Sequence, residues 1–130
     1  MAPVAKREKR ERIVFVSDVQ CPEEDPRAVE LFCKITRNHI KPHRAIFLGD
    51  FLNLDSISEY VRVGRSPSVQ EELDVAKKLL KKIVKSFGPQ CKRIEFIMGN
   101  HEWRAPRKLW TQAPGLADLR VLSIRSLLRY

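Results

Sequence analysis

The sequence has no long apolar run, and this absence excludes one class of protein. No stretch approaches the roughly 18 consecutive apolar residues that a membrane-spanning helix needs, so we expect no membrane partner. The opening residues, MAPVAKREKRER, are charged rather than apolar and therefore do not form a secretory signal. We accordingly expect a cytoplasmic protein.

The sequence also has no Cys-x-x-Cys pair. Its cysteines are Cys21, Cys33 and Cys91, an odd number at wide spacing, which excludes a disulfide scaffold and a thiolate zinc site. Cys33 lies on the apolar side of a helical pattern and is predicted to be a core residue. Cys21 follows the first predicted strand beside polar residues, so either a structural or a functional role fits it.

With 130 residues, of which 43% are hydrophobic, the chain is large enough for one globular domain. We predict a charged lead-in over residues 1–11 and a single domain over residues 12–130. The net charge of +9 favours polyanionic partners, either nucleic acid or phosphorylated substrates. Part of this charge is five lysines on the polar side of one predicted helix, a pattern typical of a solvated face. They are Lys77, Lys78, Lys81, Lys82 and Lys85.

Three short apolar runs, residues 12–17, 44–48 and 93–98, are predicted strands, and the first reads as buried on both faces. Helical patterns lie between them. The predicted helices cover residues 26–40, 54–61 and 68–87, and part of residues 101–110. The alternation of strands and helices predicts an α/β fold, with a mainly parallel sheet and flanking helices.

Polar residues follow each predicted strand where it ends. They are Asp18, Gln20, Asp50, Asn53, Asn100 and His101, with Asp55 and Glu102 close by in the sequence. The carboxyl ends of parallel strands meet at one edge of the sheet, which is where such sheets bind ligands. Oxygen donors with one imidazole suit Mn²⁺, Mg²⁺, Zn²⁺ or Fe²⁺. Taken singly, each cluster is equally compatible with ordinary turn capping.

The stretches SDVQ, LGDFLNLD and GNHEWR resemble the first three motifs of the calcineurin-like metallophosphoesterases. That family has Asp-x-His, Gly-Asp-x-x-Asp and Gly-Asn-His-Glu in this order. The residues around these motifs are most similar to those of a bacterial and bacteriophage branch that has Asp-x-Gln at the first site. The resemblance runs from Arg12 to the C-terminus and implies the first half of an α/β/β/α sandwich.

The resemblance implies a role for each matching residue. The metal ligands would be Asp18, Gln20, Asp50 and Asn100, around one ion or possibly two, with Asp50 bridging the pair. His101 would contact the scissile phosphate as the catalytic residue. Asn53 and Glu102 would lie behind the ligands, with Glu102 orienting His101. Arg104 would be either a phosphate contact or an ordinary surface arginine.

The sequence departs from the family pattern at two positions and in its later part. Gln20 replaces the usual histidine and Asn53 the usual second aspartate, and amide oxygens favour Mn²⁺ or Mg²⁺ over Zn²⁺ or Fe²⁺. The later histidine motifs of the family have no counterpart, since His39 and His43 lie upstream and read as surface or packing residues. We therefore predict a truncated domain whose outer sheet face is covered by a second copy or a partner chain.

Two functions from different classes remain open at this point. The first is a metal-dependent phosphoesterase acting on nucleotides or nucleic acid, active if oligomerisation or a partner completes the site. The second is a non-catalytic basic protein that uses the same fold to bind nucleic acid or a protein partner.

Overall fold

Three parallel strands form the sheet of this protein, whose computed structural model describes residues 10–60 and 63–129. Strands β1 (Ile13–Val16), β2 (Arg44–Phe47) and β3 (Arg93–Phe96) lie in the order β1-β2-β3. Val16 is in register with Phe47, and Phe47 with Phe96. The predicted α/β fold is confirmed. The predicted lead-in, residues 1–11, lies almost wholly outside the described residues.

The helices connect the strands and complete the chain. They are α1 (Pro26–Ile35), which continues into a π-helical turn (Thr36–Ile40), α2 (Val69–Phe87), α3 (Asn100–Gln112) and α4 (Ile124–Leu128). Short 3-10 turns cover Asp55–Ile57, Pro114–Leu116 and Arg120–Leu122. The predicted starts of α1 and α2 are confirmed, because Asp25 caps α1 and Ser68 forms a capping box with Glu71 at the start of α2. The helix predicted over residues 54–61 is wrong over its described part, which holds only the 3-10 turn Asp55–Ile57. Of the helices in the described ranges, none is long and apolar enough to cross a membrane.

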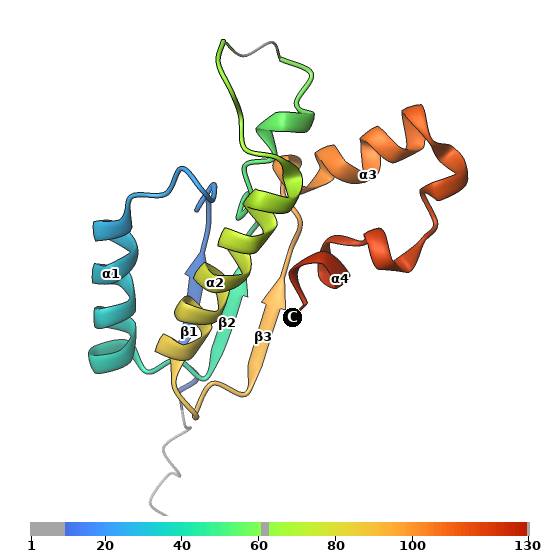
Figure 1. Ribbon diagram of the computed structural model, residues 1–130. Coiled ribbons are helices and arrows are strands. Elements are labelled where there is room, and N and C mark those ends of the chain that lie inside the picture. The colour runs from blue at the N-terminus through green and yellow to red at the C-terminus, as the bar shows by residue number, and fades with distance from the viewer. Residues whose placement is uncertain (1–9, 61–62, 130) are drawn as a thin grey trace, which may run out of the picture.

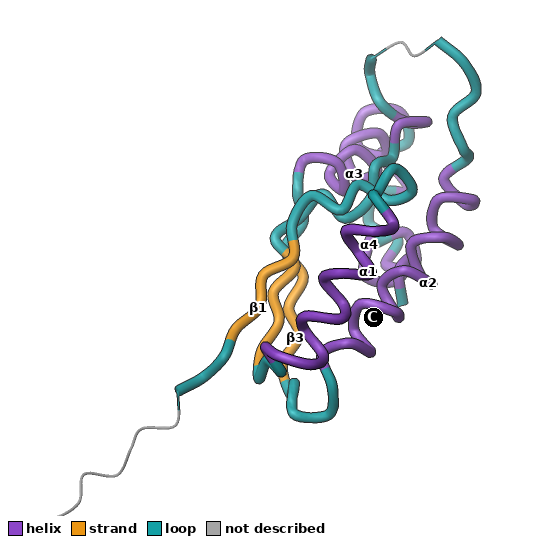
Figure 2. Tube along the Cα trace, turned by 90° about the vertical axis from the view of Figure 1, so that its left-hand side faces the viewer, coloured by secondary structure: helices purple, strands orange, loops and turns teal. Residues whose placement is uncertain are grey.

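Helices α1, α2 and α4 all cover the same face of the sheet (Figures 1 and 2). Two successive right-handed crossovers that proceed in one direction place their helices on one side, which explains α1 and α2. The core between these helices and the sheet includes Val16, Phe47, Ile83 and Phe87. Helix α3 instead leaves the end of β3 and extends away from the sheet (Figure 1).

No helix of residues 10–60 or 63–129 covers the opposite face of the sheet (Figure 2). Phe15 is 55% exposed, and Leu48 and Ile97, which directly continue the line of β2 and β3, are 45% and 52% exposed. The prediction that the first strand is buried on both faces is therefore wrong, because both crossover helices lie on one side of the sheet. The prediction that a second copy or a partner chain covers this face stays a prediction.

A buried carboxylate, Glu72, lies within the apolar side of α2. The side chain is only 1% exposed, its Oε1 accepts a hydrogen bond of 2.5 Å from the Leu54 N–H, and its Oε2 has no hydrogen-bond partner among the described residues. Burial in the core raises the pKa of Glu72, and the charge of Asp55 raises it further. Glu72 precedes Ala76 and Leu80 by four and eight positions and so lies in the apolar stripe of the helix. This position is the sequence pattern that indicates burial of Glu72.

We expect Glu72→Gln to gain stability relative to the native protein as the pH rises. A carboxyl whose pKa is raised on folding favours the folded state below its unfolded pKa, near 4.5, and loses that contribution as the pH rises through the folded pKa. The amide retains an acceptor for the Leu54 N–H but does not ionise. Urea midpoints measured at several values between about pH 4 and about pH 8 test this.

The neighbouring exposed Glu71 provides the control of opposite sign. Its pKa is lowered by hydrogen bonds from the Ser68 backbone and side chain, so its stabilisation is present above its unfolded pKa and lost in acid. Glu71→Gln should therefore lose stability relative to the native protein as the pH rises. A stability difference for Glu72→Gln that does not change with pH would contradict the assignment.

Candidate functional site

The turns after β1 and β2 run side by side beyond the end of the sheet. The Asp18 N–H donates to the Gly49 carbonyl at 3.2 Å, and the Gln20 N–H donates to the Asp50 carbonyl at 2.9 Å. Further along, the Cys21 N–H donates to a carbonyl of the second turn at 2.8 Å. The structure thus brings two of the predicted polar clusters to one edge, as parallel strand ends require.

Three of the predicted metal ligands have left-handed backbone conformations. The φ angles of Asp18, Gln20 and Asp50 are 53°, 51° and 53°. Aspartate tolerates this region because its short side chain can bond locally, whereas a longer side chain such as glutamine does so less readily. Non-glycine residues held in such conformations cluster at functional sites, which supports a functional reading of this edge.

The turns after β2 and β3 approach each other through two glycines, Gly49 and Gly99. A Cβ on Gly49 would lie 2.6 Å from both the Cα and the nitrogen of Gly99. A Cβ on Gly99 would lie 2.5 Å from the Asp50 nitrogen and closer still to the Asp50 carboxylate. The absence of side chains at both positions therefore allows Asp50 to lie against the start of α3.

The third polar cluster, at the start of α3, is joined to Asp50 by hydrogen bonds between backbone N–H groups and carboxylates. The His101 N–H donates to Asp50 Oδ1 at 2.9 Å. Glu102, which is fully buried, accepts from the N–H groups of Gly99 at 2.9 Å, Asp50 at 2.8 Å and Leu52 at 2.7 Å. The carboxylate of Glu102 thereby holds two turns together. Its three hydrogen bonds within the described residues all come from backbone N–H groups and none from the His101 ring, so the orienting role expected for Glu102 stays a prediction.

The ring of His101 is held instead by Asn53 and Arg104. His101 Nδ1 lies 2.9 Å from the Asn53 carbonyl oxygen, and a carbonyl only accepts, so Nδ1 carries the proton. The other ring nitrogen, Nε2, lies 3.5 Å from a nitrogen of the Arg104 guanidinium. The bond to Asn53 leaves Nε2 as the ring nitrogen that can meet a ligand.

Arg104 lies in this site as part of a polar cluster rather than on the open surface. Its guanidinium donates to the Asn53 carbonyl at 2.8 Å and forms an ion pair of 3.1 Å with Asp55. Both charged side chains are largely buried, at 19% and 7% exposure, and the Asn53 amide also donates to Asp55. Sequence reasoning noted Asp55 as a nearby acid but missed this ion pair, because no spacing rule joins residues 55 and 104.

The predicted metal ligands offer oxygen atoms at this edge, although few of them are charged. Within residues 10–60 and 63–129, no three His, Cys, Asp or Glu side chains form a group that could hold a metal ion. The predicted set contains only two such residues, Asp18 and Asp50, together with the amides of Gln20 and Asn100. Asp50 Oδ2 accepts no hydrogen bond from the described residues and is available to a cation. This donor set fits a hard cation that retains several waters, such as Mg²⁺ or Mn²⁺.

Acidic and basic side chains lie on different sides of the strand ends. A hollow of about 370 Å³ between β1 and α1 is lined by Asp18, Glu23, Glu24 and Asp25, among others. On the other side, a groove along α3 carries arginine and lysine side chains. The edge can thus attract a cation on one side and a phosphate on the other.

The remaining polar candidates have structural roles. Cys21 is fully buried, and burial together with the charges of Glu24 and Glu72 raises its pKa to about 12, so the thiol is protonated at neutral pH. Cys33 is a core residue, as predicted, at 2% exposure. The ring of His43 accepts a hydrogen bond of 3.0 Å from the Arg12 N–H, away from the strand-end turns, in keeping with the predicted surface or packing role.

Comparison with known proteins identifies one family. The family described as calcineurin-like phosphoesterase matches residues 11–124 of the chain. Comparison with curated proteins and with solved structures gave no match. The matched span includes all three strand-end turns.

Proposed function

Because the chain belongs to the calcineurin-like phosphoesterase family, we propose that it hydrolyses phosphoesters of nucleotides or nucleic acid at the edge where β1, β2 and β3 end. The observation that carries this proposal is the hydrogen bond from the His101 N–H to Asp50 Oδ1, which joins the second motif to the third. Asp18 and Gln20 match the Asp-x-Gln first motif of the bacterial and bacteriophage branch, which supports placing the chain in that branch of the family.

Family members bind divalent metals, and we propose that Asp18, Gln20, Asp50 and Asn100 hold one or two such ions here. The two amide oxygens favour Mn²⁺ or Mg²⁺. When bound, these ions supply Lewis-acid polarisation of the phosphoryl group and activation of water. Asp50 would be the ligand shared by two ions, because its carbonyl accepts from the Gln20 N–H and its carboxylate from the His101 N–H, which links it to both neighbouring turns.

His101 and Arg104 are proposed to act on the phosphate. The Nδ1–H of His101 is held by the Asn53 carbonyl, so a doubly protonated His101 would present Nε2–H to a phosphate oxygen and could give that proton to the leaving oxygen. Arg104 lies beside Nε2 and contributes a permanent positive charge that would stabilise charge developing on the phosphoryl oxygens. Glu102 keeps this arrangement in place through its three backbone contacts.

The proposal is tested by hydrolysis of bis-p-nitrophenyl phosphate with added Mn²⁺. We expect turnover that falls to background in Asp50→Ala, because this change removes one of only two ligand carboxylates. His101→Ala should also lose turnover while still binding Mn²⁺ in calorimetry, since its ring is proposed to contact phosphate rather than metal. Asp74→Ala, which removes an exposed acid on α2, is the matched control and should match the native protein.

A native rate that does not exceed the rate of the Asp50→Ala variant would overturn the proposal. That outcome would favour the second candidate, a non-catalytic binding protein. The specific observation in its favour is that two of the four proposed ligands are neutral amides. It predicts a salt-sensitive interaction that survives Asp18→Ala and Asp50→Ala and is unaffected by chelator.

A further inference from the structure

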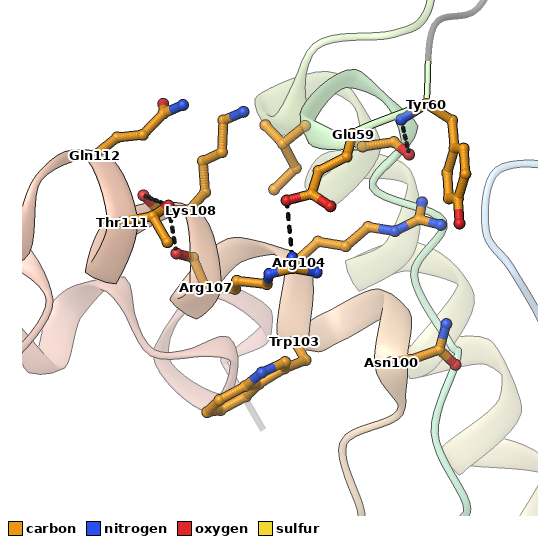
Figure 3. A pocket seen from close by; sticks show the side chains of 11 residues that line it. Glu59, Tyr60, Asn100, Trp103, Arg104, Arg107, Lys108, Thr111 and Gln112 are labelled. Atoms are coloured by element: carbon orange, nitrogen blue, oxygen red, sulfur yellow. Dashed lines mark hydrogen bonds and ion pairs between the residues drawn. The ribbon is translucent and has the colours of Figure 1, made fainter.

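A groove lies beside the strand-end site, between the turn over residues 57–60 and one side of α3 (Figure 3). It has a volume of about 270 Å³. At one end it includes Asn100, the first residue of α3 and a proposed metal ligand. A molecule lying in the groove would therefore reach the edge where the phosphoester is proposed to be cleaved.

The groove is positively charged. Arg104, Arg107 and Lys108 line it, against a single carboxylate, Glu59. Beyond Glu102, helix α3 contains no acidic residue that could neutralise these side chains. Arg104 lies three positions before Arg107 and four before Lys108, so both neighbour Arg104 on the helix surface, and all three line the groove.

Two of the three cations are available to a ligand. Arg104 is held by Asp55 at the strand-end site, whereas Arg107 pairs with Glu59 alone among the described residues, at 3.0 Å, with both side chains more than half exposed. Exposed pairs of this kind contribute little to stability, so a phosphate can replace Glu59 as the partner of Arg107. Lys108 has no ion pair with any residue in the described part of the chain.

Two aromatic side chains line the same groove as these cations. Tyr60 is 82% exposed and Trp103 is 51% exposed, and both line the groove. Figure 3 shows Tyr60 on the turn across from α3, whereas Trp103 projects from the helix on the side away from that turn. Aromatic faces next to positive charges are the arrangement that binds unpaired bases, which stack on the rings while phosphates contact the cations.

We propose that this groove binds single-stranded nucleic acid, with bases stacked on Tyr60 and Trp103 and phosphates contacting Arg107 and Lys108. As a statement about the substrate, this inference rests on the proposed function, but binding of a single strand in the groove requires no catalysis. A duplex would gain the phosphate contacts but could not stack its paired bases on the rings. An acidic peptide would use the cations and gain nothing comparable from the aromatic faces.

The experiment measures fluorescence anisotropy of a labelled oligothymidylate and of a duplex of equal length, both in EDTA. Arg107→Ala/Lys108→Ala should weaken single-strand binding by about tenfold and reduce the salt dependence by about 0.7 per lost phosphate contact. Lys78→Ala/Lys81→Ala removes the same charge from the exposed side of α2 and is the matched control, with an effect below about threefold. Circular dichroism checks that each variant is folded.

Tyr60→Ala and Trp103→Ala should each weaken binding of the oligothymidylate and leave duplex binding unchanged. Equal losses in the groove variant and the α2 control would overturn the inference, as would equal affinity for single strand and duplex. Competition by polyglutamate as effective as competition by unlabelled oligothymidylate would assign the groove to an acidic peptide instead. Since EDTA prevents metal-dependent turnover, failure of this inference is seen in anisotropy and failure of the proposed function is seen in the hydrolysis assay.

Discussion

Replacing Gly99 by alanine is expected to destabilise the protein by about 3 kcal/mol, because the new methyl group would overlap the Asp50 backbone and carboxylate. Its Cβ would lie 2.5 Å from the Asp50 nitrogen, a distance that requires the backbone to move. Because Asp50 is also the central proposed ligand, the same variant should lose Mn²⁺ binding. Guanidinium unfolding and calorimetric titration measure the two effects.

The other glycines supply graded comparisons for this prediction. Gly49→Ala should be at least as destabilising, since its Cβ would lie 2.6 Å from Gly99 and its φ is +99°. Gly64 has a φ of +108° but open space around it, so alanine there should cost only about 1 kcal/mol of backbone strain. Gly115, with no atom within 4 Å of an added Cβ, should tolerate alanine with a change within about 0.5 kcal/mol. If Gly99→Ala were no worse than Gly64→Ala, the close approach of the two turns would be refuted.

Glu102→Gln is expected to destabilise the protein by about 2–3 kcal/mol, although it changes one oxygen into a nitrogen of nearly the same size. The carboxylate accepts from the N–H groups of Asp50 and Gly99 with Oε2 and from that of Leu52 with Oε1. An amide has only one acceptor oxygen, so at least one buried N–H would face an NH₂ group. Denaturant unfolding measures the loss.

Two further variants make the Glu102 prediction sharper. Glu102→Ala removes the acceptor for all three N–H groups and should be more destabilising than Glu102→Gln. Glu23→Gln changes an exposed acid in the turn after β1 and should alter stability by less than about 0.5 kcal/mol. A Glu102→Gln variant as stable as Glu23→Gln would show that Glu102 does not hold the turns together.

These two predictions concern the same property of the site. Asp50 is placed by glycines that make room for it and by a buried carboxylate that binds the backbone on either side of it. The proposed ligands are therefore held by a rigid edge, although few of them are charged. A rigid edge reduces the entropy that the protein loses when a ligand binds there.

Much of the fold was predictable from local patterns. The strand ends, the Asp25 and Ser68 caps and the apolar stripe of α2 all depend on residues near each other in the sequence. The exposed side of the sheet was missed for β1 because an apolar run looks the same whether one face or both are covered. Burial on the second face depends on where the helices pack, which no local pattern records.

The candidate site, like the fold, has features that local sequence predicts and features that depend on packing. The sequence alone determined which residues lie at the strand ends, because each turn directly follows its own strand and parallel ends meet at one edge. Only the tertiary structure decided what those residues contact. The role of Glu102, the pairing of Arg104 with Asp55 and the groove along α3 join segments about fifty residues apart. Such contacts depend on how helices and turns pack in three dimensions, because a hydrogen bond or ion pair forms between atoms that are close in space, whatever their separation in the sequence.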